Sequence, residues 1–181
     1  MVVSALPFSE SASVAVLFPP SAVPIVDIFR ALGDFEEHYD VDSLDCLENC
    51  LARTVSRDAA KGIVSDALLL AFGLRRERNR PMAYAPLRSR RGTVDEYRLM
   101  ALIGATFWHD LSLAAEAATS LEVIHSQPLV ALAFDIARRL ESAGHKLEAP
   151  DPLLFRSTTT SAIEVPGRRA TDEDLKFSFD F

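Results

Sequence analysis

The sequence predicts an all-α protein: a single bundle of five to six helices around a central apolar helix, with short extended segments at the N- and C-termini. Apolar residues recur at helical spacing through most of residues 21–155. Capping signals stand in front of several of these runs. Of its 181 residues, 49 % are hydrophobic and 25 % charged, which is typical of one ordinary globular domain.

The N-terminal part of the chain predicts one short strand and one helix. Residues 1–20 form an N-terminal segment with a candidate strand, Ser13–Phe18, which Pro19-Pro20 ends. A helix is expected from Pro24 to Gly33, with the glycine as its C-terminal cap. Residues 34–48 follow as an acidic connector. They contain seven aspartates and glutamates but no lysine or arginine, which gives a charge of −7.

A second helix is expected near the end of the acidic connector. Asp42 or Ser43 can cap it, and the leucines at 44, 47 and 51 lie on one stripe. Cys46 and Cys50 lie one turn apart beside that stripe. We interpret both as small core residues, because a disulfide at this spacing would strain the helix.

The middle of the chain predicts the central helix. Ser56 can cap a helix that reaches about Arg78, and Pro81 prevents its continuation. Thr93 and Glu96 match a capping box in front of residues 94–108, an apolar run with almost no polar face. We expect this helix to be buried, with Phe107 and Trp108 in the core.

Two more helices complete the predicted domain, which spans residues 21–155. Asp110 can cap an alanine-rich helix through Ala118, and a last helix runs from Ser126 to Gly144. Residues 156–181 are expected to be a mobile tail. Its tip alternates apolar and polar side chains as a strand does, with apolar Leu175, Phe177, Phe179 and Phe181.

The strongest local signal is an arginine cluster inside an acidic chain. Residues 75–91 carry a charge of +6, whereas the other 164 residues carry −13. The cluster consists of Arg75, Arg76, Arg78, Arg80, Arg88, Arg90 and Arg91. Guanidinium groups bind carboxylates and phosphates bidentately, so a partner- or anion-binding role is one interpretation. Pairing with the acidic connector at 34–48, or plain solvation, are the alternatives.

Catalytic, metal-binding and cofactor-binding motifs are missing from the sequence. It contains no nucleophile elbow, no zinc-protease motif and no phosphate-binding glycine loop. Glu122 and His125 match one half of a di-metal helix motif, but a second motif is needed. Cys46 and Cys50 with His38 lack a fourth zinc ligand. His109 and Asp110 are adjacent on the chain and face different ways on a helix. We therefore expect no catalytic residues, no metal and no cofactor.

These observations favour a non-enzymatic protein–protein interaction or regulatory protein, with another protein or a second copy of the chain as partner. The tip at 175–181 is a second candidate contact, either with a partner or with its own domain. The alternatives are an anion or nucleic-acid binder that uses the arginine cluster, and an enzyme without a recognisable motif. Nucleic acid is disfavoured because the pI is about 5.1.

The sequence also bears on location. No apolar run reaches the length of a membrane span, and no basic, continuously apolar leader opens the sequence. A cytoplasmic location is the resulting expectation. Arginine outnumbers lysine 16 to 3, which is compatible with a bacterial gene of high GC content.

Overall fold

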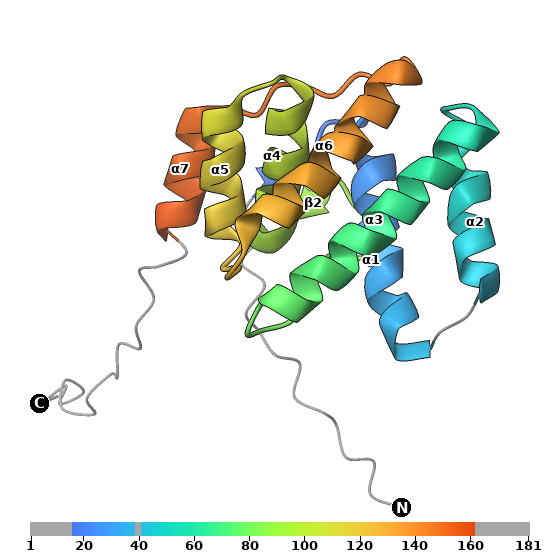
Figure 1. Cartoon of the computed structure of the whole chain (residues 1–181), viewed down its shortest axis with the longest axis horizontal. Helices are drawn as coiled ribbons and strands as arrows, with labels where there is room; N and C mark the ends of the chain where they lie inside the picture. The colour runs from blue at the N-terminus through green and yellow to red at the C-terminus, as the bar shows by residue number, and fades with distance from the viewer. Residues whose placement is uncertain (1–15, 39–40, 162–181) are drawn as a thin grey trace, which may run out of the picture.

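The computed structural model describes residues 16–38 and 41–161, and their fold is a helical bundle (Figure 1). The helices are α1 (Val23–His38), α2 (Val41–Leu51), α3 (Arg57–Glu77), α4 (Val94–Phe107), α5 (Leu111–Ser120), α6 (Ser126–Ser142) and α7 (Pro152–Ser161). Two short strands, β1 (Val16–Leu17) and β2 (Arg91–Gly92), form an antiparallel pair. The all-α prediction is therefore confirmed, with seven helices in the described residues rather than five or six.

The helices form two groups that meet along α3 and α6. At one end, α4 packs against α5 and α7, and at the other end α3 packs against α1 and α2 (Figure 1). Helix α6 contacts α3, α4 and α5, so it joins the two groups. The connection between α3 and α4 thus starts in one group and ends in the other.

Helix α4 is the buried centre that the sequence predicts. Every residue from Asp95 to Thr106 is buried, and Leu102 has no exposed surface. The capping box is present, because Thr93 accepts from the Glu96 amide and Glu96 accepts from the Thr93 amide. Asp110 caps α5 and Ser56 caps α3, as the sequence predicts.

The C-terminal end of α4 corrects two core predictions. Phe107 is only partly buried, and Trp108 is 55 % exposed. Trp108 is the residue at which the helix stops, so its ring lies beyond the packed part of α4. Its indole Nε1 donates to the main-chain oxygen of Leu147 at 3.0 Å, which holds the ring against the α6–α7 connection.

Helix α1 does not stop at Gly33. It continues to His38, so the predicted C-terminal cap is wrong. A Cβ atom at position 33 would lie 2.7 Å from the ring of Tyr84. The glycine is needed because the segment that follows α3 crosses α1 at this point, and only a residue without a side chain leaves room for the tyrosine.

The cysteines of α2 are not core residues. Both Cys46 and Cys50 are exposed, whereas Leu51 is buried and Leu44 and Leu47 are partly buried. The leucine stripe alone faces the bundle, and the two cysteines fall outside it. Their assignment to the core was wrong because α2 covers only one side of α3 and keeps a wide solvent face.

The C-terminal region differs from expectation by one helix. Helix α7 spans Pro152–Ser161, so helical structure extends beyond residue 155, where the sequence puts the end of the domain. Phe155 is buried and its ring lies 6.2 Å from that of Tyr97 in α4. The tip at 175–181 lies outside the described residues. Among the described helices, none has the length and apolarity that crossing a bilayer demands.

Candidate functional site

The candidate site is the arginine loop, residues 78–92, which connects α3 to α4. Acidic side chains from two helices bind its main chain. Glu96 of α4 accepts from the amide of Ala85 at 2.9 Å and from that of Thr93 at 2.9 Å. Asp95, also of α4, accepts from the amide of Ala83 at 3.1 Å. The conformation of the loop is therefore fixed from the interior of the domain.

Arg30 of α1 completes this fixation from the other side. Its guanidinium is buried and pairs bidentately with Glu96, at 2.6 Å from Nε and 3.1 Å from Nη2. It also donates to the main-chain oxygens of Ser89 at 2.8 Å and Arg91 at 3.2 Å. Burial alone would lower the pKa of Arg30, but Glu96 and Asp27 raise it above its ordinary value, so the charge persists.

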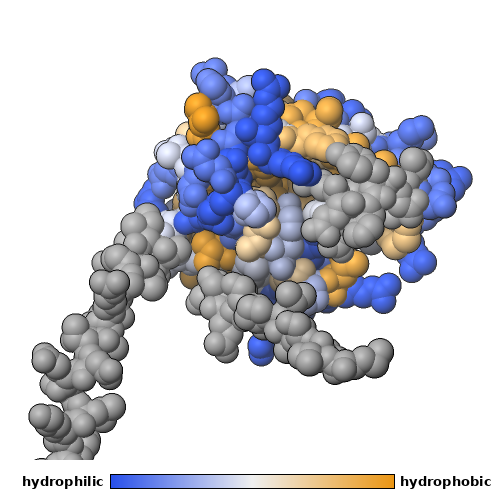
Figure 2. Space-filling model, turned by 90° about the horizontal axis from the view of Figure 1, so that it is seen from below, coloured by the Kyte–Doolittle hydropathy of each residue, from blue (hydrophilic) through white to orange (hydrophobic). Residues whose placement is uncertain are grey.

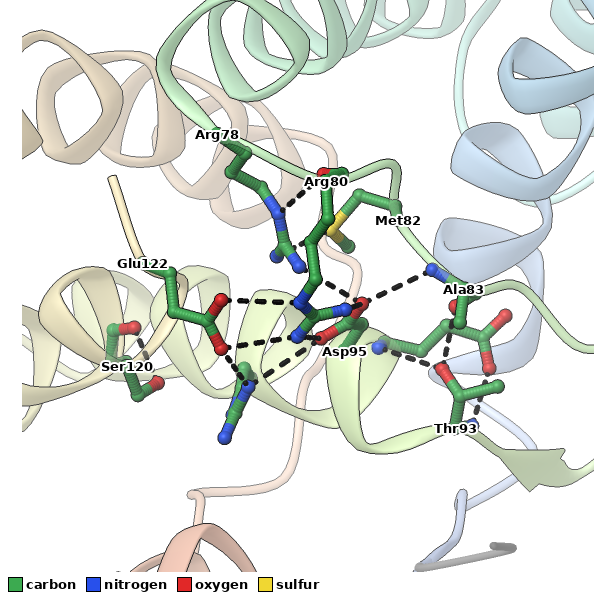
Figure 3. A network of polar contacts seen from close by, with 11 residues as sticks. Arg78, Arg80, Met82, Ala83, Thr93, Asp95, Ser120 and Glu122 are labelled. Carbon is green, nitrogen blue, oxygen red and sulfur yellow. Dashed lines mark hydrogen bonds and ion pairs between the residues drawn. The ribbon is translucent and has the colours of Figure 1, made fainter. Parts of the chain in front are cut away.

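Two arginines of the cluster form ion pairs with Asp95 of the same domain (Figure 3). Arg78 has a fully buried side chain and donates to Asp95 at 3.0 Å. Arg80 forms two hydrogen bonds to the same carboxylate, at 2.8 and 2.9 Å. Burial tends to raise the pKa of Asp95, but the hydrogen bonds from Arg80 and Ala83 and the two positive charges lower it below its usual value.

Glu122 extends this ion-pair network to the corner between α5 and α6 (Figure 3). Both of its oxygens accept from Arg80 at 3.1 Å, and this contact lowers the pKa of Glu122. Arg98 of α4 approaches the network more loosely, at 3.4 Å from Glu122 and 3.5 Å from Asp95. The Nε of Arg98 is buried with no hydrogen-bond acceptor among the described residues. The network thus joins α3, α4 and the α5–α6 corner.

The tip of the arginine loop is a tight turn with a strained residue. The amide of Ser89 donates to the oxygen of Pro86, which closes a β-turn with Arg88 at its third position. Arg88 has φ 62°, the left-handed conformation that type II turns require and that glycine adopts most easily. Both oxygens of Asp27 accept from the Arg88 amide, at 3.0 and 3.1 Å, and this contact stabilises the turn.

Besides Arg80, which pairs with Asp95 and Glu122, three arginines of the loop have exposed side chains: Arg88, Arg90 and Arg91. None of the three pairs with a carboxylate within the described part of the chain. Arg90 donates from Nε to the main-chain oxygen of Phe18 at 3.0 Å, which directs it along β1. The loop therefore carries three positive charges on a main chain that is already ordered.

Two exposed leucines accompany these arginines. Leu87 is 51 % exposed at the turn, and Leu17 of β1 is 61 % exposed. Leu17 is the direct partner of Arg91 in the β1–β2 pair, so their side chains project from the same face. We call the set Leu17, Leu87, Arg88, Arg90 and Arg91 the arginine surface. Seen from below, the described part of the molecule shows hydrophilic and hydrophobic areas next to each other (Figure 2).

The remaining two arginines of the cluster lie on α3. Arg75 and Arg76 are exposed in its last turn, as the sequence predicts from the helix dipole. Glu77 between this turn and the loop contacts His125, with 3.0 Å between the carboxylate and Nδ1. This hydrogen bond lowers the pKa of Glu77. It ties the end of α3 to the start of α6.

The seven arginines of the predicted site thus do not act as one group. Arg78 and Arg80 bind Asp95 and Glu122, which lie outside the acidic connector at 34–48. The side chains of residues 34–41 and 43 lie outside the described part of the structure, so pairing of the cluster with that connector stays a prediction. The half-motif of Glu122 and His125 is divided between two contacts: Glu122 pairs with Arg80, and His125 is hydrogen-bonded to Glu77.

Sequence reasoning missed the residues that shape the site from α1 and β1. Asp27 and Arg30 lie three residues apart in a mostly apolar stretch. Charged side chains in such a stretch are a signal for buried pairing, because burial of an unpaired charge is costly. Leu17 had no signal beyond its place in a predicted strand. The predicted tail residues Leu175, Phe177, Phe179 and Phe181 lie outside the described residues.

The comparisons with known proteins add no relative. No protein-family model, no curated protein and no solved structure matches the chain.

Proposed function

We propose that this protein is a non-enzymatic interaction protein whose arginine surface binds a short acidic segment of another protein. The observation that carries the proposal is the main-chain fixation of the arginine loop by Asp27, Glu96 and Asp95. A loop that is ordered before binding loses little conformational entropy when it binds. Three arginines on such a loop that pair with no carboxylate among the described residues favour a negatively charged partner.

The composition of the arginine surface supports a protein partner. Arginine is enriched at protein interfaces, and apolar side chains supply the desolvated contact between the charges. Leu17 and Leu87 provide such contacts beside Arg91 and Arg88. Five side chains are too few for the roughly 800 Å² that each partner buries in a stable complex of two folded domains. They fit one extended segment with alternating acidic and apolar residues.

The position of Arg88 supports the proposal independently. A left-handed residue other than glycine costs about 1–2 kcal/mol, and glycine would avoid this cost. The chain places an arginine there and holds it with Asp27. An arginine that is kept at such a position and faces solvent favours a role outside the packing of the domain.

The test uses the full chain and defined peptides. Fluorescein-labelled 12-residue peptides, in which Asp and Glu alternate with Leu and Phe, are titrated with the protein and followed by anisotropy. Matched peptides with Asn and Gln are the control ligands. The acidic peptides are expected to bind, and affinity is expected to fall at least tenfold between 50 and 300 mM salt because the contact is electrostatic.

Arg88→Gly separates binding from folding. Glycine relieves the strain of the turn but gains conformational entropy in the unfolded chain, so stability should stay equal or rise by about 1 kcal/mol at most. The affinity should fall about tenfold, because one positive charge is lost from the surface. Arg53→Gly is the matched control, because Arg53 is exposed in the turn after α2. The same titrations are repeated on the full chain with Asp172→Arg and Asp174→Arg, in which the acidic residues of the C-terminal segment are reversed in charge. Equal binding of the acidic and neutral peptides by both proteins, or equal binding by wild type and Arg88→Gly, would refute the proposal. Tight binding of duplex DNA at physiological salt would show that the partner is a nucleic acid and not a protein.

A further inference from the structure

The C-terminal residues of this chain have the chemistry that the arginine surface fits. Residues 171–181 lie outside the described residues, but their sequence is Thr-Asp-Glu-Asp-Leu-Lys-Phe-Ser-Phe-Asp-Phe. Four carboxylates and one lysine give this segment a net charge of −3. An acidic triplet, Asp172 to Asp174, directly precedes the apolar residues that alternate from Leu175 onward.

This segment and the arginine surface are complementary in charge and in apolar character. The arginine surface carries three positive charges on Arg88, Arg90 and Arg91, and none pairs with a carboxylate among the described residues. Leu17 and Leu87 stand beside them with about half or more of their surface exposed. Burial of apolar side chains of the segment against these leucines removes apolar area of both from water.

The chain is long enough for this contact within one molecule. Helix α7 ends at Ser161, and residues 162–170 connect it to the acidic segment. Nine extended residues span about 30 Å. A domain of about 150 residues has a radius of gyration of only about 15 Å.

We propose that residues 171–181 dock on the arginine surface of their own molecule and compete there with an external acidic partner. This inference rests on the proposed function, since it assigns a second occupant to the same surface. A tethered segment acts at an effective concentration in the millimolar range. Even a weak contact therefore keeps the surface occupied until a partner of higher affinity displaces the segment.

The test locates the segment by photo-crosslinking in the full chain. The photoreactive amino acid p-benzoylphenylalanine replaces Phe179, the protein is irradiated, and crosslinked peptides are identified by mass spectrometry. Crosslinks are expected to residues 16–18 and 84–92, in a product that migrates as a monomer. The yield should fall severalfold at 500 mM salt, because the Debye length is then shorter than the contact region.

A charge exchange provides the specific control. Arg88→Glu with Arg91→Glu should remove these crosslinks, and so should Asp172→Arg with Asp174→Arg. The protein that carries all four substitutions should recover them, since the charges are again complementary. Recovery cannot come from a folding defect, because the combined protein contains every change that either pair introduces.

Each outcome decides between the two proposals. Crosslinks elsewhere on the domain, or crosslinks that persist in both charge-reversed proteins, would refute docking of the segment on the arginine surface. Crosslinks only in a dimeric product would refute docking within one molecule. In either case the proposed function stands if acidic peptides still bind and Arg88→Gly weakens them. If no acidic peptide binds either, both proposals fail.

Discussion

The buried pair of Arg30 and Glu96 allows a sharp test of what holds this domain together. The chain contains a second pair with the same chemistry, Arg156 and Glu116, in which the guanidinium also binds both carboxylate oxygens. The two pairs differ in burial: Glu96 has no exposed side-chain surface, whereas Glu116 is 38 % exposed. Glu96→Gln and Glu116→Gln make the same covalent change in these two settings.

Glu96→Gln should destabilise the protein by about 3–5 kcal/mol, because it leaves the charge of Arg30 buried without its main partner. The carboxylate of Glu96 accepts four hydrogen bonds, from the two Arg30 nitrogens and from the amides of Ala85 and Thr93. A glutamine amide offers only one accepting oxygen to these donors. Glu116→Gln should change stability by less than the error of the fit, because water solvates both partners when the exposed pair is broken.

Urea denaturation of the full chain, followed by circular dichroism at 222 nm, measures both losses. Hydrogen exchange adds a local measurement, since the amides of Ala85 and Thr93 should exchange much faster in Glu96→Gln. Equal losses in the two variants would refute the argument from burial. If the two amides exchange fast while the global stability is unchanged, Glu96 acts only on the loop. This result would contradict the predicted loss of about 3–5 kcal/mol.

Other consequences of the structure are open to simple measurements. Leu102→Ala should cost about 2–5 kcal/mol in the same urea melts, and a negligible loss would show that α4 is not the centre of the core. Asp95→Asn should destabilise the protein by about 3 kcal/mol, because it leaves the buried charge of Arg78 without a carboxylate. Arg98→Met should destabilise it by less than about 1 kcal/mol, because the ionic contacts of Arg98 are long. The reverse order of the two losses would contradict the network. The pKa values of Asp95 and Glu122 are lowered in the folded protein, so below about pH 4 the unfolded chain binds more protons than the folded one. The melting temperature should therefore drop as the pH falls below this value, and it should drop less steeply in Asp95→Asn. An equal drop in both proteins would show that Asp95 does not contribute.

The local features of the fold were predictable because their causes are local. The capping box of Thr93 and Glu96 and the caps at Ser56 and Asp110 depend on residues three positions apart, and all appear where the sequence indicates. The burial of α4 follows from its lack of a polar face. The continuation of α1 past Gly33 was not predictable from the local sequence. Position 33 has no room for a side chain because the ring of Tyr84, 51 positions further along the chain, packs against it.

Helix α7 was missed although its start signal is present. Asp151 accepts from the amides of Leu153 and Leu154, and Pro152 occupies the first turn, which is the usual place for proline in a helix. The hydroxyl-rich residues that follow predict irregular structure. In the folded chain, however, hydroxyl groups such as those of Thr158 and Thr159 donate to main-chain oxygens of the preceding turn. A helix can therefore accommodate this run once Phe155 anchors it.

The candidate site was predictable in position but not in structure. Seven arginines in a short segment mark a site, yet the sequence does not say which of them pair with a carboxylate of the same domain. The partners that decide this are far away along the chain: Arg80 binds Glu122 at a separation of 42 residues, and Arg88 is held by Asp27 at 61. Only the fold brings such groups together.

The division of the arginines explains how an acidic protein can present a basic surface. Asp27, Asp95 and Glu96 bind the main chain of the loop, and Asp95 also neutralises Arg78 and Arg80 at its base. These carboxylates are therefore engaged from the inside and are not available to the arginines at the tip. The three tip arginines pair with no carboxylate among the described residues, and the carboxylates that contact the loop bind its main-chain amides instead. Without these carboxylates, the free carbonyl groups of the loop would hydrogen-bond to its arginines, or the loop would become ordered only on binding. Either change would weaken the contact with a partner.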